Sequence, residues 1–180
     1  LPYDRVSPSS DIVSRRIDTL SRLGQDERTP GRPRVLVTTV NALLQRVLTP
    51  FRVREAVVEL KPGMSIKHEA LIALLVRQGY SRTDTVIDHG EFAVRGSIFD
   101  VFPSGLEAGL RLDFFGDDLE SLRLFDPNTQ MTTGTLDRHL LLPASEALLD
   151  DETINRFRTR YRELFGAHAT QDPLYQAISE

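Results

Sequence analysis

Hydrophobic positions in the first fifty residues recur with the period of a helix and then give way to a short apolar run. A polar capping cluster at residues 9–11 is followed by apolar side chains at helical spacing: Val13, Ile17, Leu20 and Leu23. Gly24 then ends the predicted helix. The β-branched run VLVTTV at residues 35–40 is typical of a strand buried on both faces. Asn41 then follows as the N-cap of a helix. Helix, buried strand and helix in this order predict part of a parallel α/β sheet.

The pattern changes beyond Pro50, which closes this first unit. Residues 57–60 predict a short strand, and residues 67–78 carry the apolar stripe of an amphipathic helix. The period then becomes two, and strands are predicted at 84–88, 91–95, 98–102, 110–115, 119–125 and 136–142. The links between them are short, which indicates an antiparallel meander covered by the 67–78 helix. A final amphipathic helix is predicted through Ile154, Phe157, Tyr161, Leu164 and Phe165. The predicted fold class is α/β, of the α+β kind, with an antiparallel sheet domain beside an incomplete parallel α/β unit.

The two faces of the predicted meander differ in chemistry. In LRLDFF, residues 110–115, the leucines and Phe114 point to one side while Arg111, Asp113 and Phe115 point to the other. The aliphatic side is expected to take the helix. Arginine beside exposed phenylalanine is typical of a recognition surface, and lysine, the usual solubilising cation, occurs only twice in the chain. A plain solvent-facing surface explains the same alternation, so the pattern alone leaves both interpretations open.

The stretch GEFAVRGSIFDVFP, residues 90–103, holds the least regular part of this pattern. Alternation places Arg95 on the outward face, and Gly96 allows either a β-bulge or the close approach of a partner's backbone. Asp100 interrupts the second apolar run. Either it joins the arginine face or it is buried and hydrogen-bonded, and the pattern does not fix the face that Phe99 takes.

Composition and charge narrow the function classes. The chain has 180 residues and no cysteine, so disulfides and thiolate metal sites are excluded, which fits a reducing cytoplasm. No apolar run reaches the length of a membrane span. Residues 1–50, 51–142 and 143–180 carry net charges of +3, −4 and −3, which argues against a stand-alone nucleic-acid binder. Since the chain starts at Leu1 without a signal-peptide pattern, we expect a piece of a longer protein.

No motif in the sequence indicates catalysis, and no catalytic, cofactor-binding or metal-binding residue is predicted. The glycine-rich phosphate loop, HExxH, GxSxG and GxGxxG patterns are all absent. Asp113, Asp117, Asp118 and Glu120 could suggest a metal site, but a hairpin turn at residues 116–118 explains this stretch better. RFRTRYR, residues 156–162, has the composition of a phosphate-binding stripe, but helical spacing spreads its arginines around a polar arc. We favour a solvated helix face over a phosphate contact there.

The meander resembles a known family. HGEFAVRGSIFDVFPSG, followed by RLDFFGDDLESLRLFDPNTQ, is similar to the excinuclease interaction domain of two kinds of bacterial repair protein. These are the B component of the nucleotide excision nuclease and the transcription-repair coupling factors. SPSSDIVSRRIDTLSRL, VLVTTVNALLQRV and LLPASE extend the resemblance over nearly the whole chain. The tyrosine-rich hairpin of the B component is missing after Tyr3-Asp4, and Ala93 stands where the B component tends to have arginine. Both departures favour the N-terminal module of the coupling factors.

The resemblance implies a domain organisation and a partner. Residues 51–142 would be an interaction domain inserted in a degenerate helicase-like α/β domain, whose flanking parts are residues 1–50 and 143–180. The inserted domain would bind the A component of the excision nuclease. The family's interaction positions map onto Arg82, Arg95, Phe99, Arg111 and Asp113. The mapping is closest where VRG and RLDFFGD align without gaps.

A non-catalytic role is also implied by the resemblance. This module would recruit the A component, in the cytoplasm, to lesions at which RNA polymerase has stalled, and it would need no cofactor of its own. The full-length protein would be an ATP-dependent DNA translocase that uses magnesium and contacts RNA polymerase and double-stranded DNA. No membrane or small-molecule partner is expected. Three alternatives stay open: a fragment of the B component, a direct DNA-binding module, and an enzyme with an unrecognised site.

Overall fold

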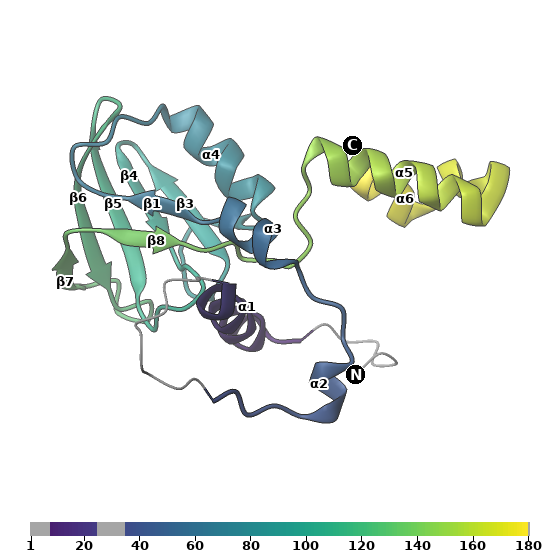
Figure 1. The fold of residues 1–180 in the computed structure, drawn as a ribbon. Coiled ribbons are helices and arrows are strands. Elements are labelled where there is room, and N and C mark those ends of the chain that lie inside the picture. The colour runs from purple at the N-terminus through teal and green to yellow at the C-terminus, as the bar shows by residue number, and fades with distance from the viewer. Residues whose placement is uncertain (1–7, 25–34, 180) are drawn as a thin grey trace.

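A six-stranded mixed sheet forms the centre of the molecule (Figure 1). The structure, a computed structural model, describes residues 8–24 and 35–179. The strands run in the order β2-β3-β4-β5-β6-β7, with β2 parallel to β3 and the other neighbouring pairs antiparallel. Their bounds are Ser81–Arg82, Glu91–Arg95, Ile98–Val101, Gly109–Phe115, Asp118–Phe125 and Thr132–Leu136. The predicted α+β fold class and the antiparallel meander, here β3 to β7, are confirmed.

One face of the sheet is covered and forms the main core. Helix α4 (His68–Arg77) lies over it, as the sequence predicts for residues 67–78, together with the antiparallel pair β1 (Val58–Leu60) and β8 (His139–Leu141) (Figure 1). Alternate residues of the meander point into this layer. Its fully buried side chains include Leu60, Leu71, Leu75, Phe92, Phe99, Leu110, Leu112 and Leu141. Each contributes roughly 2 kcal/mol on burial, so this layer is the main source of stability.

Two tight hairpins lie side by side at one end of the sheet. Gly96-Ser97 joins β3 to β4, and Gly116-Asp117 joins β5 to β6, as the sequence predicts for the second turn. The glycines have φ values of +61° and +62°, which glycine adopts without strain and which the first position of a type II′ turn requires. Gly96 therefore forms a turn rather than a bulge. The amide of Phe114 donates to the carbonyl of Ser97 at 3.0 Å and holds the two hairpins together.

Two strand predictions in this region are wrong. Residues 84–88 form a loop, because side chains occupy the backbone groups that a strand would pair: Arg95 and Gln130 bind carbonyl groups of the loop, and Glu91 binds two of its amides. The predicted strand at 136–142 is divided at a polar step. Its first residue ends β7 on the large sheet, and most of the remainder is β8 on the small sheet.

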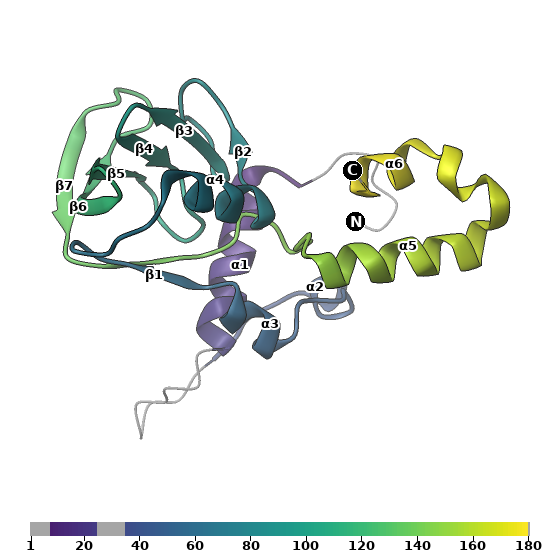
Figure 2. The same ribbon diagram turned by 90° about the horizontal axis from the view of Figure 1, so that it is seen from above.

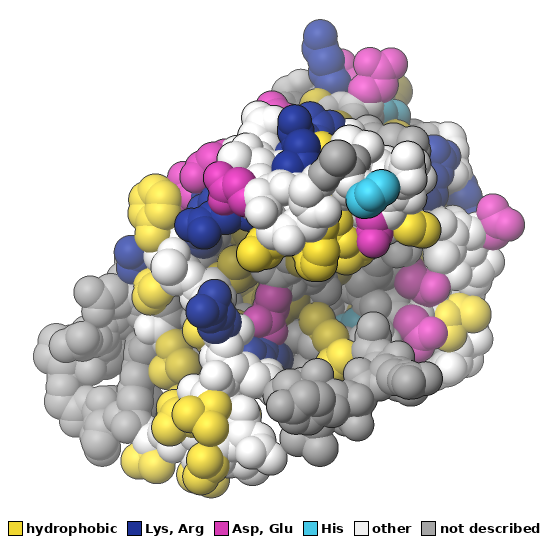
Figure 3. Space-filling view, turned by 90° about the vertical axis from the view of Figure 1, so that its right-hand side faces the viewer, with side chains coloured by type: hydrophobic (Ala, Val, Ile, Leu, Met, Phe, Trp, Pro, Cys, Tyr) yellow, Lys and Arg dark blue, Asp and Glu magenta, His cyan; other side chains and the backbone are white. Residues whose placement is uncertain are grey.

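The N-terminal unit departs furthest from the prediction. Helix α1 (Ser10–Gly24) is confirmed and buries Ile17. The strand predicted at residues 35–40 is wrong: Val35 and Val37 are 86% and 90% exposed. Among the described residues no strand lies beside this run, so its backbone has no ladder to join. Figure 3 shows the apolar side chains that the segment around α2 leaves at the surface, in the lower part of the view.

The two short helices that follow also begin at unpredicted places. The helix expected after Asn41 is a single turn, α2 (Val40–Leu43), and Thr39 caps it. Pro50 begins an element instead of closing one, because it occupies the first turn of α3 (Pro50–Glu55), where its missing N–H has no helical partner to lose. Both helices are too short to be stable without packing.

An arm of two helices projects from the sheet at the C-terminal end (Figures 1 and 2). It consists of α5 (Asp151–Phe165), the 3₁₀ turn η1 (Gly166–Gln171) and α6 (Pro173–Ser179). Phe157 and Tyr161 contact Tyr175 of α6, which confirms the predicted amphipathic helix. Arg156 is exposed, as expected for a solvated face. Across the described ranges, no helix is long and apolar enough to cross a membrane.

Candidate protein-binding face

The face of the sheet opposite α4 carries two rows of mostly polar side chains, which we call the charged face. Strand pairing across β3 to β6 sets the rows, because directly opposed residues point to the same side. One row holds Arg95, Ile98, Asp113 and Ser121, and the next holds Asp100, Arg111 and Arg123. The predicted outward position of Arg95, Arg111 and Asp113 is therefore what the structure shows.

Asp100 and Arg111 form a bidentate ion pair between β4 and β5. Nε of Arg111 donates to Oδ1 of Asp100 at 2.6 Å, and Nη2 donates to Oδ2 at 2.9 Å. The two side chains are only 2% and 16% exposed. The hydrogen bond to Asp100 raises the pKa of Arg111, against the opposing effect of burial. Both alternatives for Asp100 thus hold at once, since it joins the arginine face and is also buried and hydrogen-bonded.

An aromatic ring completes this pair. The guanidinium carbon of Arg111 lies 4.9 Å from the centre of the Phe125 ring, within range of a cation–π contact. The ring itself lies over Gly109, where a side chain would collide with it. Phe125 also packs with Val86 and Phe102 in a small second core on this side of the sheet. The charged face is therefore only partly open to solvent.

Asp113 makes the second internal ion pair. Its carboxylate accepts two hydrogen bonds of 2.6 Å from Arg123 and a third, of 2.7 Å, from the hydroxyl of Ser121. Burial raises the pKa of Asp113. The hydrogen bonds from Arg123 and Ser121, together with the charges of Arg123 and Arg111, lower it by more, so the net shift is downward. Asp113 is thus ionised at neutral pH and already satisfied within the domain.

Arg95 is the exposed arginine of the charged face. Among the described residues it contacts no carboxylate, and instead its Nη2 donates to the carbonyl of Asp84 at 2.7 Å and to the hydroxyl of Thr85 at 3.2 Å. These bonds tie it to the 84–88 loop, which inserts the fully buried Val86 into the second core. The full positive charge of Arg95 remains available at the surface in a defined orientation.

The structure does not bring the other two predicted residues onto this face. Arg82 is exposed on the edge strand β2, where the register aligns it with Phe92 of the core-facing row. Phe99 is completely buried. Its ring packs edge-on against Phe114 and His68, with ring centres 5.4 and 5.0 Å apart. Phe99 therefore belongs to the core beneath α4 in this conformation.

Phe115 is an exposed residue that the set of predicted site residues omits. It ends β5 beside the Gly116-Asp117 turn, and 75% of its surface is exposed. The alternation that the sequence analysis used does place Phe115 on the same side as Arg111 and Asp113. Alternation cannot show that one phenylalanine of the face is covered, as Phe125 is, while another is left open.

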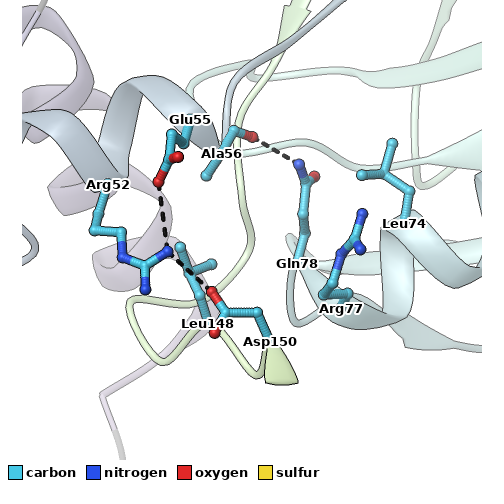
Figure 4. Close-up of a pocket in the computed structure, with 8 residues that line it drawn as sticks. All are labelled: Arg52, Glu55, Ala56, Leu74, Arg77, Gln78, Leu148 and Asp150. Atoms are coloured by element: carbon cyan, nitrogen blue, oxygen red, sulfur yellow. Dashed lines mark hydrogen bonds and ion pairs between the residues drawn. The ribbon is translucent and has the colours of Figure 1, made fainter. Parts of the chain in front are cut away.

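A small polar cavity lies away from the charged face, where α3, the end of α4 and the start of α5 meet (Figure 4). Its volume is about 250 Å³. Arg52 crosses this junction and binds Asp150 at 3.1 Å and Glu152 at 2.7 Å, and the charge of Asp150 is the largest cause of the raised pKa of Arg52. Gln78 donates to the carbonyl of Ala56 at 2.6 Å. The cation is neutralised and the amide nitrogen of Gln78 is bound, while its Oε1 atom is buried without a partner among the described residues. These contacts join α3 to the ends of α4 and α5.

No cluster of metal ligands is present in the described part of the chain. Its His, Asp and Glu side chains form no group of three or more with the spacing of metal ligands. The two carboxylates of the charged face are each paired with arginine. The charged face is thus a set of mutually neutralised ion pairs with Arg95 and Phe115 exposed at its edge.

Residues 58–146 match the UvrB interaction domain family. The match covers just under half of the chain, and in these residues the chain is similar to a UvrB interaction domain. The match coincides closely with the region from β1 to just beyond β8, and it includes all of the charged face. A UvrB interaction domain is a binding module, which agrees with the role that the sequence predicts for this part of the chain.

Named relatives extend the likeness over the whole chain. The chain is 38% identical over 180 residues to the transcription-repair-coupling factor of Escherichia coli and 36% identical over 182 residues to that of Haemophilus influenzae. It is 41% identical over 162 residues, or 90% of the chain, to that of Myxococcus xanthus. It spans 15%, 15% and 13% of the lengths of these relatives. The resemblance to the coupling factors is confirmed, and the likeness covers a small part of each.

Proposed function

We propose that this chain is the module of a transcription-repair coupling factor that recruits the A component of the excision nuclease, and that the charged face is its binding surface. The match to a UvrB interaction domain supports a protein partner. The relatives are named for the coupling of transcription to repair. A face that combines arginine with an exposed aromatic residue fits protein recognition, where these residue types are enriched.

The observation that carries the proposal is the state of Arg95. Arg111 and Arg123 are each held by a carboxylate of the same domain, whereas Arg95 is exposed and, within the described ranges, bonded to neutral oxygen atoms. A partner carboxylate can pair with this guanidinium and supply the counter-charge that the neutral oxygen atoms do not. Because the 84–88 loop already orients Arg95, little rotamer entropy is lost on binding.

The other predicted positions take different parts in this proposal. Arg111 and Asp113 fix the side chains of this face through their internal ion pairs, and Arg82 offers a second exposed cation from the edge strand. Phe99 supports β4 from the core. Direct contact through the charged face is assigned to Arg95, and contact from outside that face, at the sheet edge, is assigned to Arg82.

The activity proposed for the whole protein goes beyond this chain. A coupling factor of this kind would move on double-stranded DNA with ATP and magnesium, displace a stalled RNA polymerase, and present this module to the A component. The motor would lie elsewhere in the protein, since the chain corresponds to 15% of the Escherichia coli relative. The module itself would take no cofactor.

Calorimetric titration of the purified A component into the 180-residue chain tests the proposal. The chain is expected to bind, and Arg95→Ala should weaken binding about 30-fold, because truncating one member of a desolvated charge pair removes about 2 kcal/mol or more. Arg156→Glu, at an exposed position on α5, is the control and should bind like the parent. No binding by the parent chain would overturn the proposal. Sub-micromolar binding to duplex DNA that Arg156→Glu abolishes would support a DNA-binding module instead.

A further inference from the structure

One phenylalanine of the interaction domain is not used by the fold. Residues 58–146 contain six phenylalanines, and five of them are at most 6% exposed, at positions 92, 99, 102, 114 and 125. Phe115 is 75% exposed. The neighbouring Gly116 supplies the backbone geometry of the turn, so the hairpin does not need an aromatic ring at position 115.

Phe115 lies at the same end of the sheet as Arg95. The Gly96-Ser97 and Gly116-Asp117 turns are joined by the hydrogen bond from the amide of Phe114 to the carbonyl of Ser97, and both turns are at the top of the sheet in Figure 1. Register places Ile98 between Arg95 and Asp113. The edge of the charged face thus presents a cation, the half-buried Ile98 and an open phenyl ring.

The charges around this edge indicate what it can meet. Arg95 is exposed on one side, bonded to backbone and hydroxyl oxygen atoms, and Asp117 and Asp118 are exposed on the other, in the hairpin that follows Phe115. Arg111, Arg123 and their carboxylate partners are mutually neutralised between them. A complementary surface therefore has an apolar pocket, an acidic group facing Arg95, and a basic group facing the aspartates.

We propose that Phe115 is the apolar anchor of the interface, and that it enters a pocket of the A component with this arrangement of charges. The proposal rests on the proposed function. It assigns to Phe115 the aromatic contact for which Phe99, fully buried, is unsuited. Burying a phenylalanine in a partner's pocket is a typical source of hot-spot energy, and a charged neighbour such as Arg95 adds specificity.

Binding of the A component to single variants of the 180-residue chain tests this inference. Phe115→Ala should weaken binding about 30-fold, the effect of a hot-spot truncation, and Phe115→Leu should retain most of the affinity. Phe51→Ala is the matched control, because Phe51 is 60% exposed on α3, away from the charged face. Melting temperatures of all three variants should equal that of the parent, since both rings lie mostly in solvent.

The salt dependence of binding distinguishes the contact made by Arg95 from the contact made by Phe115. Raising the ionic strength should shrink the effect of Arg95→Ala and leave the effect of Phe115→Ala unchanged, because screening acts on charge and not on apolar burial. If the parent chain binds the A component and the affinity of Phe115→Ala is within twofold of the parent's, Phe115 is not the anchor, while the proposed function stands. If the parent chain does not bind the A component, the proposed function fails, and the anchor fails with it.

Discussion

Asp100 and Arg111 face each other from adjacent strands, and one guanidinium occupies both oxygen atoms of one carboxylate. This relationship explains how an acid is accommodated inside an apolar strand. The carboxylate is almost completely buried, but it is charged, paired and held between β4 and β5. Arg111 is capped in turn by the Phe125 ring. Two of the three arginines on this face are thus bound by carboxylates of the domain, and the proposed function assigns recognition to Arg95.

The ion pair predicts a specific pattern of stability losses. Asp100→Asn or Arg111→Gln alone should each lower the free energy of unfolding by about 3 kcal/mol, because each leaves a charged partner buried without its counter-charge. The double variant should lose less than the sum of the two, with a coupling energy of about 1–3 kcal/mol. Urea denaturation of the four proteins measures this. Additive losses would show that the two side chains do not depend on one another.

Gly109 and Phe125 give a second prediction. A methyl group at position 109 would occupy the space of the Phe125 ring, so Gly109→Ala should destabilise the fold by about 2 kcal/mol through overpacking. Gly134→Ala is the control, because its new methyl would only reach ordinary contact, 3.8 Å from Leu124. Melting curves compare them. Adding Phe125→Leu to Gly109→Ala should restore part of the loss, and equal stability of the two alanine variants would contradict the packing argument.

Phe99 yields a prediction that separates packing from binding. Phe99→Ala should lower the free energy of unfolding by about 3–5 kcal/mol, as expected for a large cavity in the core. Phe99→Leu keeps most of the apolar volume, so it should fold and should bind the A component like the parent chain. Calorimetry with melting curves tests both variants. A Phe99→Leu variant that melts normally and fails to bind would show that the partner reaches this ring.

The sequence predicts the parts of this fold in which one period persists over a complete element. The alternation in β5 and β6 gives the correct faces for Leu112, Arg111 and Asp113, because one side of the sheet is buried and the other is not. It fails at residues 84–88, where the apolar pair Val86-Ile87 lies between polar residues and predicts a strand that does not form. There the partners of the backbone are side chains distant in the sequence, and no local pattern encodes them.

The candidate site is predicted less completely than the fold, for a related reason. Composition identifies the arginine face, and alternation places Arg95 on it. Whether an arginine is free or paired depends on cross-strand register, which brings Asp100 opposite Arg111 from eleven residues away. Whether a phenylalanine is open or covered depends on distant segments, as the coverage of Phe125 by Val86 shows. Register and coverage are tertiary properties. The sequence therefore predicts the face on which Phe115 lies, but it does not show that Phe115 is the phenylalanine left exposed there.

His139 gives a prediction about pH. It lies on β8, mostly buried beside α1, and its Nε2 atom has no hydrogen-bond partner among the described residues. Burial lowers the pKa of His139. The unfolded chain therefore takes up a proton at this imidazole near pH 6.5, whereas the folded chain does so only at lower pH. Between those two values the unfolded state binds more protons, so the free energy of unfolding falls as the pH falls below about 6.5.

A series of urea denaturation curves from pH 7.5 to pH 5 tests this. The parent chain should lose stability on acidification, with a slope of at most about 1.4 kcal/mol per pH unit from this one group. His139→Gln should have a flatter profile, because it removes the group that titrates differently in the two states. His168→Gln is the control, since His168 is exposed on the helical arm and should leave the parent's slope unchanged. If His139→Gln keeps the full slope, the loss of stability comes from another group, and the imidazole of His139 is not the one that destabilises the fold in acid.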